Sequence, residues 1–391
     1  MGMKRRIASD ARRSEASRPG LRRLGIGLLV SLIVLGIAHT LYWRSVEQQL
    51  ERGLEAWVAA RRAEGWQVRI GGTERGGWPL AARLRATDVA LEGGADDLPG
   101  GLAWNADHLA LSVRLLEPRL LTIEPGGTQR LRLSVLPMLA YTADRIRADI
   151  PLEPGTTVHH VTVRADNLRA GAAEASRADD TGPQVTSRSE TRLSIGLLQA
   201  VTDLYPDRGP SAPVAGLTLS AEAIGLPAGL GHVLGGHISS LSFDGTLDGP
   251  LPSTGSQFTR ESGARMPGVT RRASAWRDGG GSIAVQRVSL GWGPLGLTGS
   301  GKLGLDAQLQ PIATGTARVI GYAETLDRLA TNGLISPGAA TAVKALAGLI
   351  ARTPEGGGPA EIEVPLGVQD RMLSIRQIPL ARIPELTWPA D

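Results

Sequence analysis

The sequence predicts a mainly β protein with one N-terminal transmembrane helix, and three observations predict it. The segment Leu24–Trp43 contains no charged residue. Beyond it, short segments repeatedly alternate apolar and polar residues, the pattern of antiparallel strands with one apolar face. The chain also holds 51 glycines and 25 prolines, and many of them stand in pairs between those segments, where turns are expected.

The apolar segment 24–43 fits a membrane span. At about 1.5 Å per residue it reaches the ~30 Å thickness of the hydrocarbon core. Tyr42 and Trp43 end it with rings that prefer the membrane interface, and His39 lies close to that end. The run exceeds the ~7–15 apolar residues of a signal peptide, and no small-residue cleavage site follows. We therefore expect an uncleaved anchor, and not a signal peptide or a core helix.

The charge of the chain is unevenly distributed. Residues 1–23 carry eight Lys/Arg and two acidic residues, so the remainder has a net charge of −2 although the whole chain has +4. Because basic residues favour the cytoplasmic side, we expect residues 1–23 to form a cytoplasmic tail and the C-terminal body to lie across the membrane. That body has no basic excess, so no nucleic-acid partner is expected.

The body divides into a stalk helix and a β-rich domain. Apolar residues at 46, 50, 54 and 58 recur at helical spacing, which predicts a stalk helix over 44–65 that ends at Gly65. The β-rich domain is expected over 66–391, with mobile loops near 169–190 and 249–281 and a short helix around Arg271–Arg277. A helical hairpin is expected near the C-terminus, with Tyr322–Thr331 followed by a helix that Ser336 caps and Pro337 begins.

The apolar sides of the strands are the candidate site. A long sheet with one apolar face must bury that face against something, and the chain offers little helix and few aromatic residues to cover it. An apolar surface left open usually marks a binding site. We therefore predict an apolar groove, and an alternative is a sheet that closes on itself as a sandwich. The residues predicted to line the groove are Leu109, Leu111, Val113, Leu303, Leu305 and Leu309.

Catalytic, cofactor-binding and metal-binding residues are not predicted. The chain has no cysteine, and its six histidines are scattered. The segment 296–302, GLTGSGK, approaches a phosphate-binding loop, but Leu303 replaces the required hydroxyl residue and a strand, not a helix, is expected to follow. An enzyme is therefore the remote alternative.

Two segments resemble a known family. The first is 65–91, in which Gly77-Trp78-Pro79 opens an alternating strand, and the second is 276–383, with its Gly-Trp-Gly-Pro turn at 291–294 and the helical hairpin. Both resemble the uncharacterised proteobacterial family called domain of unknown function 2125, in which the first motif is usually Gly-Phe-Pro. The arrangement is also similar to AsmA-like envelope proteins, which are thought to handle lipids between bacterial membranes. This resemblance carries over no catalytic residue.

Two functions therefore stand as expectations. One is a protein anchored in the bacterial inner membrane whose periplasmic domain handles lipid or maintains the envelope. The other is a tethered structural or protein-interaction module with a closed β core. An apolar cleft along the sheet favours the first, and a closed core with a polar exterior favours the second. The lipid, any protein partner and the oligomeric state are left open by the sequence.

Overall fold

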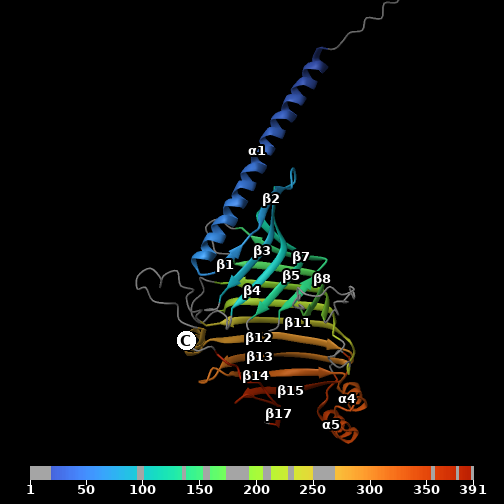
Figure 1. Cartoon of the computed structure of the whole chain (residues 1–391). Helices are drawn as coiled ribbons and strands as arrows, with labels where there is room; N and C mark the ends of the chain where they lie inside the picture. The colour runs from blue at the N-terminus through green and yellow to red at the C-terminus, as the bar shows by residue number, and fades with distance from the viewer. Residues whose placement is uncertain are drawn as a thin grey trace, which may run out of the picture.

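The computed structural model describes residues 19–94, 101–133, 138–152, 159–172, 193–205, 213–227, 233–249, 269–353, 357–375 and 378–388. Its main parts are a long N-terminal helix and one large antiparallel sheet (Figure 1). The prediction of a mainly β protein with an N-terminal apolar helix is confirmed, and so is the prediction of one long antiparallel sheet.

Helix α1 runs from Pro19 to Ala63 without a break. It begins at a proline, which is favoured at a first helical turn, and Gly65 follows its end with φ +88°. The predicted span and stalk are therefore two parts of one helix. The last five residues of the predicted tail, 19–23, also lie in this helix, and residues 1–18 lie outside the described part of the chain.

The N-terminal part of α1 has no protein cover. From Ile26 to Leu41 its large apolar side chains are exposed. Within the described residues, α1 is the one helix long and apolar enough to cross a membrane, with a mean hydropathy of 1.9 in its best window. This helix thus has the length and the apolar composition that the predicted anchor requires.

The C-terminal part of α1 packs on the sheet. Half-buried or buried positions recur at 43, 46, 47, 50, 54 and 58, which is one side of a helix, and α1 contacts β1, β3 and β4. Trp43 Nε1 donates to the Ala81 carbonyl at 2.7 Å, and Arg75 pairs with Glu51 at 2.6 Å. These contacts fix the direction of the stalk relative to the sheet.

The strands follow one another through the rest of the chain. Their bounds are β1 Gln67–Arg69, β2 Gly72–Gly76, β3 Ala81–Gly93, β4 Leu102–Arg114, β5 Glu117–Leu133, β6 Leu139–Thr142, β7 Arg145–Pro151, β8 His160–Ala172, β9 Leu193–Leu204, β10 Pro213–Gly225, β11 His237–Asp248, β12 Ser282–Trp292, β13 Leu295–Leu305, β14 Pro311–Ile320, β15 Glu361–Gln369, β16 Met372–Ile375 and β17 Ile378–Arg382.

The sheet is close to a simple meander. From β8 to β17 each strand pairs antiparallel with the next, as do β3, β4 and β5. Strands β1 and β2 share one edge of β3, and β6 and β7 lie between β5 and β8. The two ends of the sheet lie at opposite ends of the molecule, with β2 beside α1 and β17 far from it (Figure 1).

The first of the two predicted loops is partly wrong. Residues 169–172 belong to β8, because they pair with β6 and β9, and 173–190 lie outside the described residues. In the second loop, the helix expected around Arg271–Arg277 is present as α3, Val269–Asp278. Residues 250–268 are also outside the described part.

The predicted helical hairpin is confirmed. Helix α4 is Tyr322–Thr331 and α5 is Pro337–Ile350. Gly333 has φ +73° in the turn after α4, and Ser336 Oγ accepts from the Ala339 amide at 3.1 Å. This hairpin lies at the end of the molecule away from α1 (Figure 1).

Candidate functional site

The register of the strands gives the sheet one apolar face. Side chains of directly paired residues lie on the same face, so a row of partners can be followed from strand to strand. One such row, from β4 to β15, is Leu111, Ile123, Ala148, Val163, Ala200, Leu219, Phe243, Val288, Gly299, Ala317 and Val364. We call the face that holds this row the apolar face.

The adjacent row lies on the other face and is polar except for Val201. From β4 to β12 it reads Ser112, Thr122, Asp149, Thr162, Val201, Thr218, Asp244 and Arg287. The contrast between the two rows shows that the alternation read in the sequence runs across the whole sheet. We call this second surface the polar face.

The apolar face is covered at the α1 end and becomes more accessible along the sheet. Near α1 the residues Ala82, Leu84, Leu111 and Val113 are buried. From β9 to β15 most residues of this face are half-buried. All described strands belong to one sheet.

The predicted groove residues fall into two groups. Leu109, Leu111 and Val113 lie on the apolar face of β4, where Leu111 and Val113 are buried and therefore part of the packed core. Leu303 and Leu305 lie on the apolar face of β13, where Leu303 is 36% exposed. The two groups share a face but are separated by the strands between β4 and β13.

The placement of Leu309 on an alternating strand is wrong. Strand β13 ends at Leu305, and Leu309 lies in the following turn with φ +59°. The Asp306 carboxylate accepts from the amides of Gln308 and Gln310, each at 2.8 Å, and so forms the turn. Leu309 is buried, and its carbonyl accepts from Trp388 Nε1 at 3.0 Å. It is therefore a core contact of the C-terminal segment.

The apolar face is hollowed over β12 to β16. A cavity of about 210 Å³ there is lined mainly by aliphatic side chains and glycines, among them Val285, Leu297, Leu303, Leu366 and Leu373. Gly301 and Gly315 form a directly paired position in this region. A Cβ on Gly315 would lie 2.4 Å from the Ser300 carbonyl oxygen, so the close approach of β13 and β14 requires glycine there.

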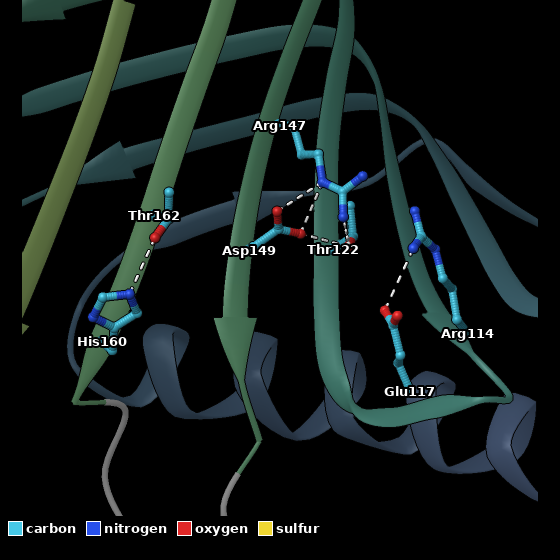
Figure 2. Close-up of polar contacts among 7 residues, drawn as sticks. All are labelled: Arg114, Glu117, Thr122, Arg147, Asp149, His160 and Thr162. Atoms are coloured by element: carbon cyan, nitrogen blue, oxygen red, sulfur yellow. Dashed lines mark hydrogen bonds and ion pairs between the residues drawn. The ribbon is translucent and has the colours of Figure 1, made fainter. Parts of the chain in front are cut away.

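On the polar face, charged side chains bind one another (Figure 2). Arg147 Nε lies 2.7 Å from Asp149 Oδ2, and Thr122 Oγ1 donates to Asp149 Oδ1 at 2.7 Å. In Figure 2 these side chains stand in front of the strands, and α1 passes behind them, on the side of the apolar face. The polar face thus carries charged side chains that pair with one another.

The contacts of Asp149 predict an acid-dependent stability. Burial acts to raise its pKa, but the hydrogen bonds from Arg147 and Thr122 outweigh burial, so the pKa of Asp149 is lowered. A carboxylate with a lowered pKa stabilises the fold above its unfolded pKa of about 3.9, and this contribution is lost as the pH falls through the folded value. Asp149→Asn should therefore destabilise the protein by about 1–2 kcal/mol at pH 7.

Urea unfolding of both proteins between pH 7 and pH 3 checks this. The difference between wild type and Asp149→Asn should shrink below about pH 4, where the wild-type carboxylate also becomes neutral. A difference that is constant across this range would show that the ion pair contributes nothing to stability.

The described residues contain no group of three or more His, Asp, Glu or Cys that could hold a metal ion. His160 pairs instead with Asp203 at 2.7 Å, and the ring of His159 lies 3.3 Å from the Leu204 carbonyl. The segment 296–302, which approached a phosphate-binding loop in sequence, lies within β13. In the structure, His159 and His160 make contacts between neighbouring strands, and the segment 296–302 is part of a strand.

A family model described as "Uncharacterized protein conserved in bacteria (DUF2125)" matches residues 43–384. The chain belongs to this family. The match begins at Trp43, where the stalk part of α1 leaves the apolar segment, and it covers the whole sheet and both helices of the hairpin. No curated protein and no solved structure matches the chain. The resemblance found from the two sequence segments is thus confirmed for the DUF2125 region.

Sequence reasoning missed the middle of the apolar face. Strands β8 to β11 contribute Val163, Leu219 and Phe243, and none of them is among the predicted groove residues. The signal was present, because Leu217, Leu219 and Ala221 alternate with Thr218 and Ser220 in the sequence. In the DUF2125 region the candidate site is therefore a continuous face, and not two separate strands.

Proposed function

We propose that this protein is anchored in the bacterial inner membrane, with its N-terminus cytoplasmic, and that its periplasmic domain handles lipid on the apolar face. The single observation that supports the proposal best is the unbroken apolar row from β4 to β15 on a single sheet. The proposal concerns binding, and it assigns no catalytic residue, cofactor or nucleic-acid partner.

The dimensions of the apolar face suit acyl chains. At about 4.8 Å per strand, the row from β4 to β15 extends on the order of 50 Å. One leaflet of a bilayer has a hydrocarbon thickness of about 15 Å, half of the ~30 Å core. The face can therefore take more than one acyl chain along its length. Acyl chains need no specific hydrogen bonds, and aliphatic side chains and glycines supply the contacts that they require.

The asymmetry of the sheet supports the same proposal. A sheet that is polar on one face and apolar on the other holds a lipid tail on the apolar face while the polar face stays in water. The apolar hollow over β12 to β16 contains Leu303, one of the more exposed large apolar side chains of the sheet. Such exposure is unfavourable in water unless something covers it.

Photo-crosslinking in living cells tests lipid binding with the full chain. A photoreactive amino acid at Leu303, on the apolar face, should form adducts with phospholipid, and one at Thr298 should not. Thr298 is the matched control because it is exposed on the polar face of the same strand, away from the residues that line the hollow. Equal lipid labelling at both positions, or none at Leu303, would contradict the proposal.

The proposed orientation is tested separately. The eight Lys/Arg of residues 1–23 precede the apolar segment, so the C-terminus should lie in the periplasm. A reporter enzyme that is active only in the periplasm should be active when fused after Asp391, and a cytoplasm-specific reporter should be inactive there. The reverse result would show that the orientation is wrong.

A tethered interaction module is the second candidate, and α5 favours it. Val343, Leu346, Leu349 and Ile350 are exposed apolar residues on this helix, and exposed apolar patches often bind proteins. Crosslinks from Leu346 to a protein, together with no lipid adduct at Leu303, would favour this function over lipid handling.

A further inference from the structure

Two exposed apolar turns lie at the end of the sheet that is nearest to α1. One is Gly77–Leu80 between β2 and β3, where Trp78 is 61% and Leu80 is 76% exposed. The other is Leu115–Leu116 between β4 and β5, where Leu116 is 93% exposed. The two turns are joined, because the Leu115 amide donates to the Leu80 carbonyl at 3.1 Å. Together they form one apolar tip.

This tip lies against the membrane-spanning part of α1. His39 Nε2 donates to the Pro79 carbonyl at 2.7 Å. A hollow of about 370 Å³ separates Trp78 from α1, and the α1 residues that line it are Ile33, Gly36, Ile37, Thr40, Leu41 and Arg44. Figure 1 shows the strand ends near β2 rising beside α1. The tip therefore stands beside the last turns of the apolar segment 24–43, and not below them.

The shape of the first turn displays Trp78 outward. Gly77 has φ +94°, and a Cβ there would lie 2.5 Å from the Ala81 carbonyl oxygen. The Ala81 amide donates to the Gly77 carbonyl at 3.0 Å and closes the turn. The local backbone thus holds a tryptophan, the residue most typical of membrane interfaces, at the depth of the end of the span.

We infer that the apolar tip inserts into the interfacial layer of the same bilayer that α1 crosses. Residues Trp78, Leu80 and Leu116 then lie among the lipid headgroups and upper acyl chains. Exposed Arg114 and Arg119 flank the second turn. Arg114 pairs with Glu117 at 3.4 Å, so Arg119 is the residue that is placed to contact lipid phosphates. This inference rests on the membrane anchor of the proposed function, and it does not require lipid binding by the apolar face.

Insertion of the tip gives the domain a second point of attachment. A single helix lets the attached body rotate about its axis, whereas a helix and an inserted tip fix the tilt of the sheet against the bilayer. Ala82 and Val113, paired on the apolar face, follow the two turns directly. The apolar face therefore begins at the surface of the membrane.

The chain has no cysteine, so one introduced cysteine can carry a single environment-sensitive fluorophore. The full-length protein is labelled in this way and reconstituted in phosphatidylethanolamine–phosphatidylglycerol vesicles. Labels on Leu80→Cys and Leu116→Cys should fluoresce at shorter wavelength than a label on Leu334→Cys. Lipids with a spin label near the headgroup should quench the labels on Leu80→Cys and Leu116→Cys several-fold more strongly than the label on Leu334→Cys. Leu334 is the matched control, since it is an exposed leucine in the turn between α4 and α5 at the far end of the molecule.

Leu35→Cys, on the exposed apolar part of α1, reports the anchor itself, and its quenching is measured with lipids that carry the spin label deep in the acyl chain, because Leu35 lies near the middle of the segment 24–43. In one outcome, the label at Leu35 is quenched while the labels at Leu80 and Leu116 behave like the label at Leu334. That result would overturn the insertion of the tip and leave the anchor standing. An unquenched label at Leu35 would overturn the anchor and the insertion together. Quenching at all three positions and not at Leu334 supports the insertion, whatever the crosslinking from Leu303 shows.

Discussion

Replacing both Leu303 and Leu305 with glutamate should abolish lipid crosslinking on the apolar face while the sheet remains folded. Both residues lie on that face of β13, and Leu303 is partly exposed, so a carboxylate there can reach water. A charge in the groove strongly disfavours an acyl chain, because an unpaired charge loses its hydration when hydrocarbon covers it. The measurement is lipid labelling from a photoreactive residue at Leu297, which lines the same hollow.

Leu84→Glu separates a groove position from a core position. Leu84 is on the same face but 0% exposed, so an unpaired carboxylate there should cost several kcal/mol and unfold the domain. Limited proteolysis distinguishes the two outcomes, with the double variant as resistant as wild type and Leu84→Glu rapidly degraded. If the double variant is degraded as fast as Leu84→Glu, the apolar face at β13 is an ordinary core.

Gly315→Ala should be among the most destabilising substitutions in the sheet. Its Cβ would lie 2.4 Å from the Ser300 carbonyl oxygen and 3.1 Å from the Gly301 Cα. Both atoms belong to the backbone of β13, so relief requires that the two strands separate. We expect a loss of about 3 kcal/mol, measured by urea unfolding.

Gly304→Ala provides the matched control for this clash. Gly304 pairs with Ile312 in the same two strands, but the nearest atom to its Cβ is the Ile312 Cγ1 at 3.6 Å, an ordinary contact. Its effect should stay within about 0.5 kcal/mol. Equal losses for the two variants would show that the close approach at Gly315 is relieved without cost.

Local patterns were sufficient to predict the apolar helix, the helical hairpin and the alternating strands. The charge-free run 24–43 predicts the apolar part of α1, and Gly333, Ser336 and Pro337 predict the hairpin, because each of these signals acts over a few residues. The alternation at 109–113 and 303–305 predicts strands with one apolar side, and the register confirms that side. Alternation with a period of two residues identifies a strand and also shows on which of its two faces each residue lies.

The same patterns could not distinguish an open sheet from a sandwich. Alternation is identical in both, and only the pairing of strands far apart in sequence decides between them. Leu309 shows a second limit, since alternation continued past Leu305 into a turn that the Asp306 side chain closes. The apolar tip was missed for a related reason, because Gly77-Trp78-Pro79 reads as the start of a strand while its position beside α1 depends on tertiary contacts.

The meander has a consequence for how the chain reaches its fold. Since nearly every strand pairs with the one made just before it, few contacts must wait for a distant segment. Low sequence separation between partners favours rapid folding and limits the time for which unpaired edges are exposed. In the proposed orientation, α1 is made first and held in the bilayer, and each later strand emerges on the far side of the membrane beside the strand with which it pairs. The sheet would then be completed strand by strand, starting from the end next to α1.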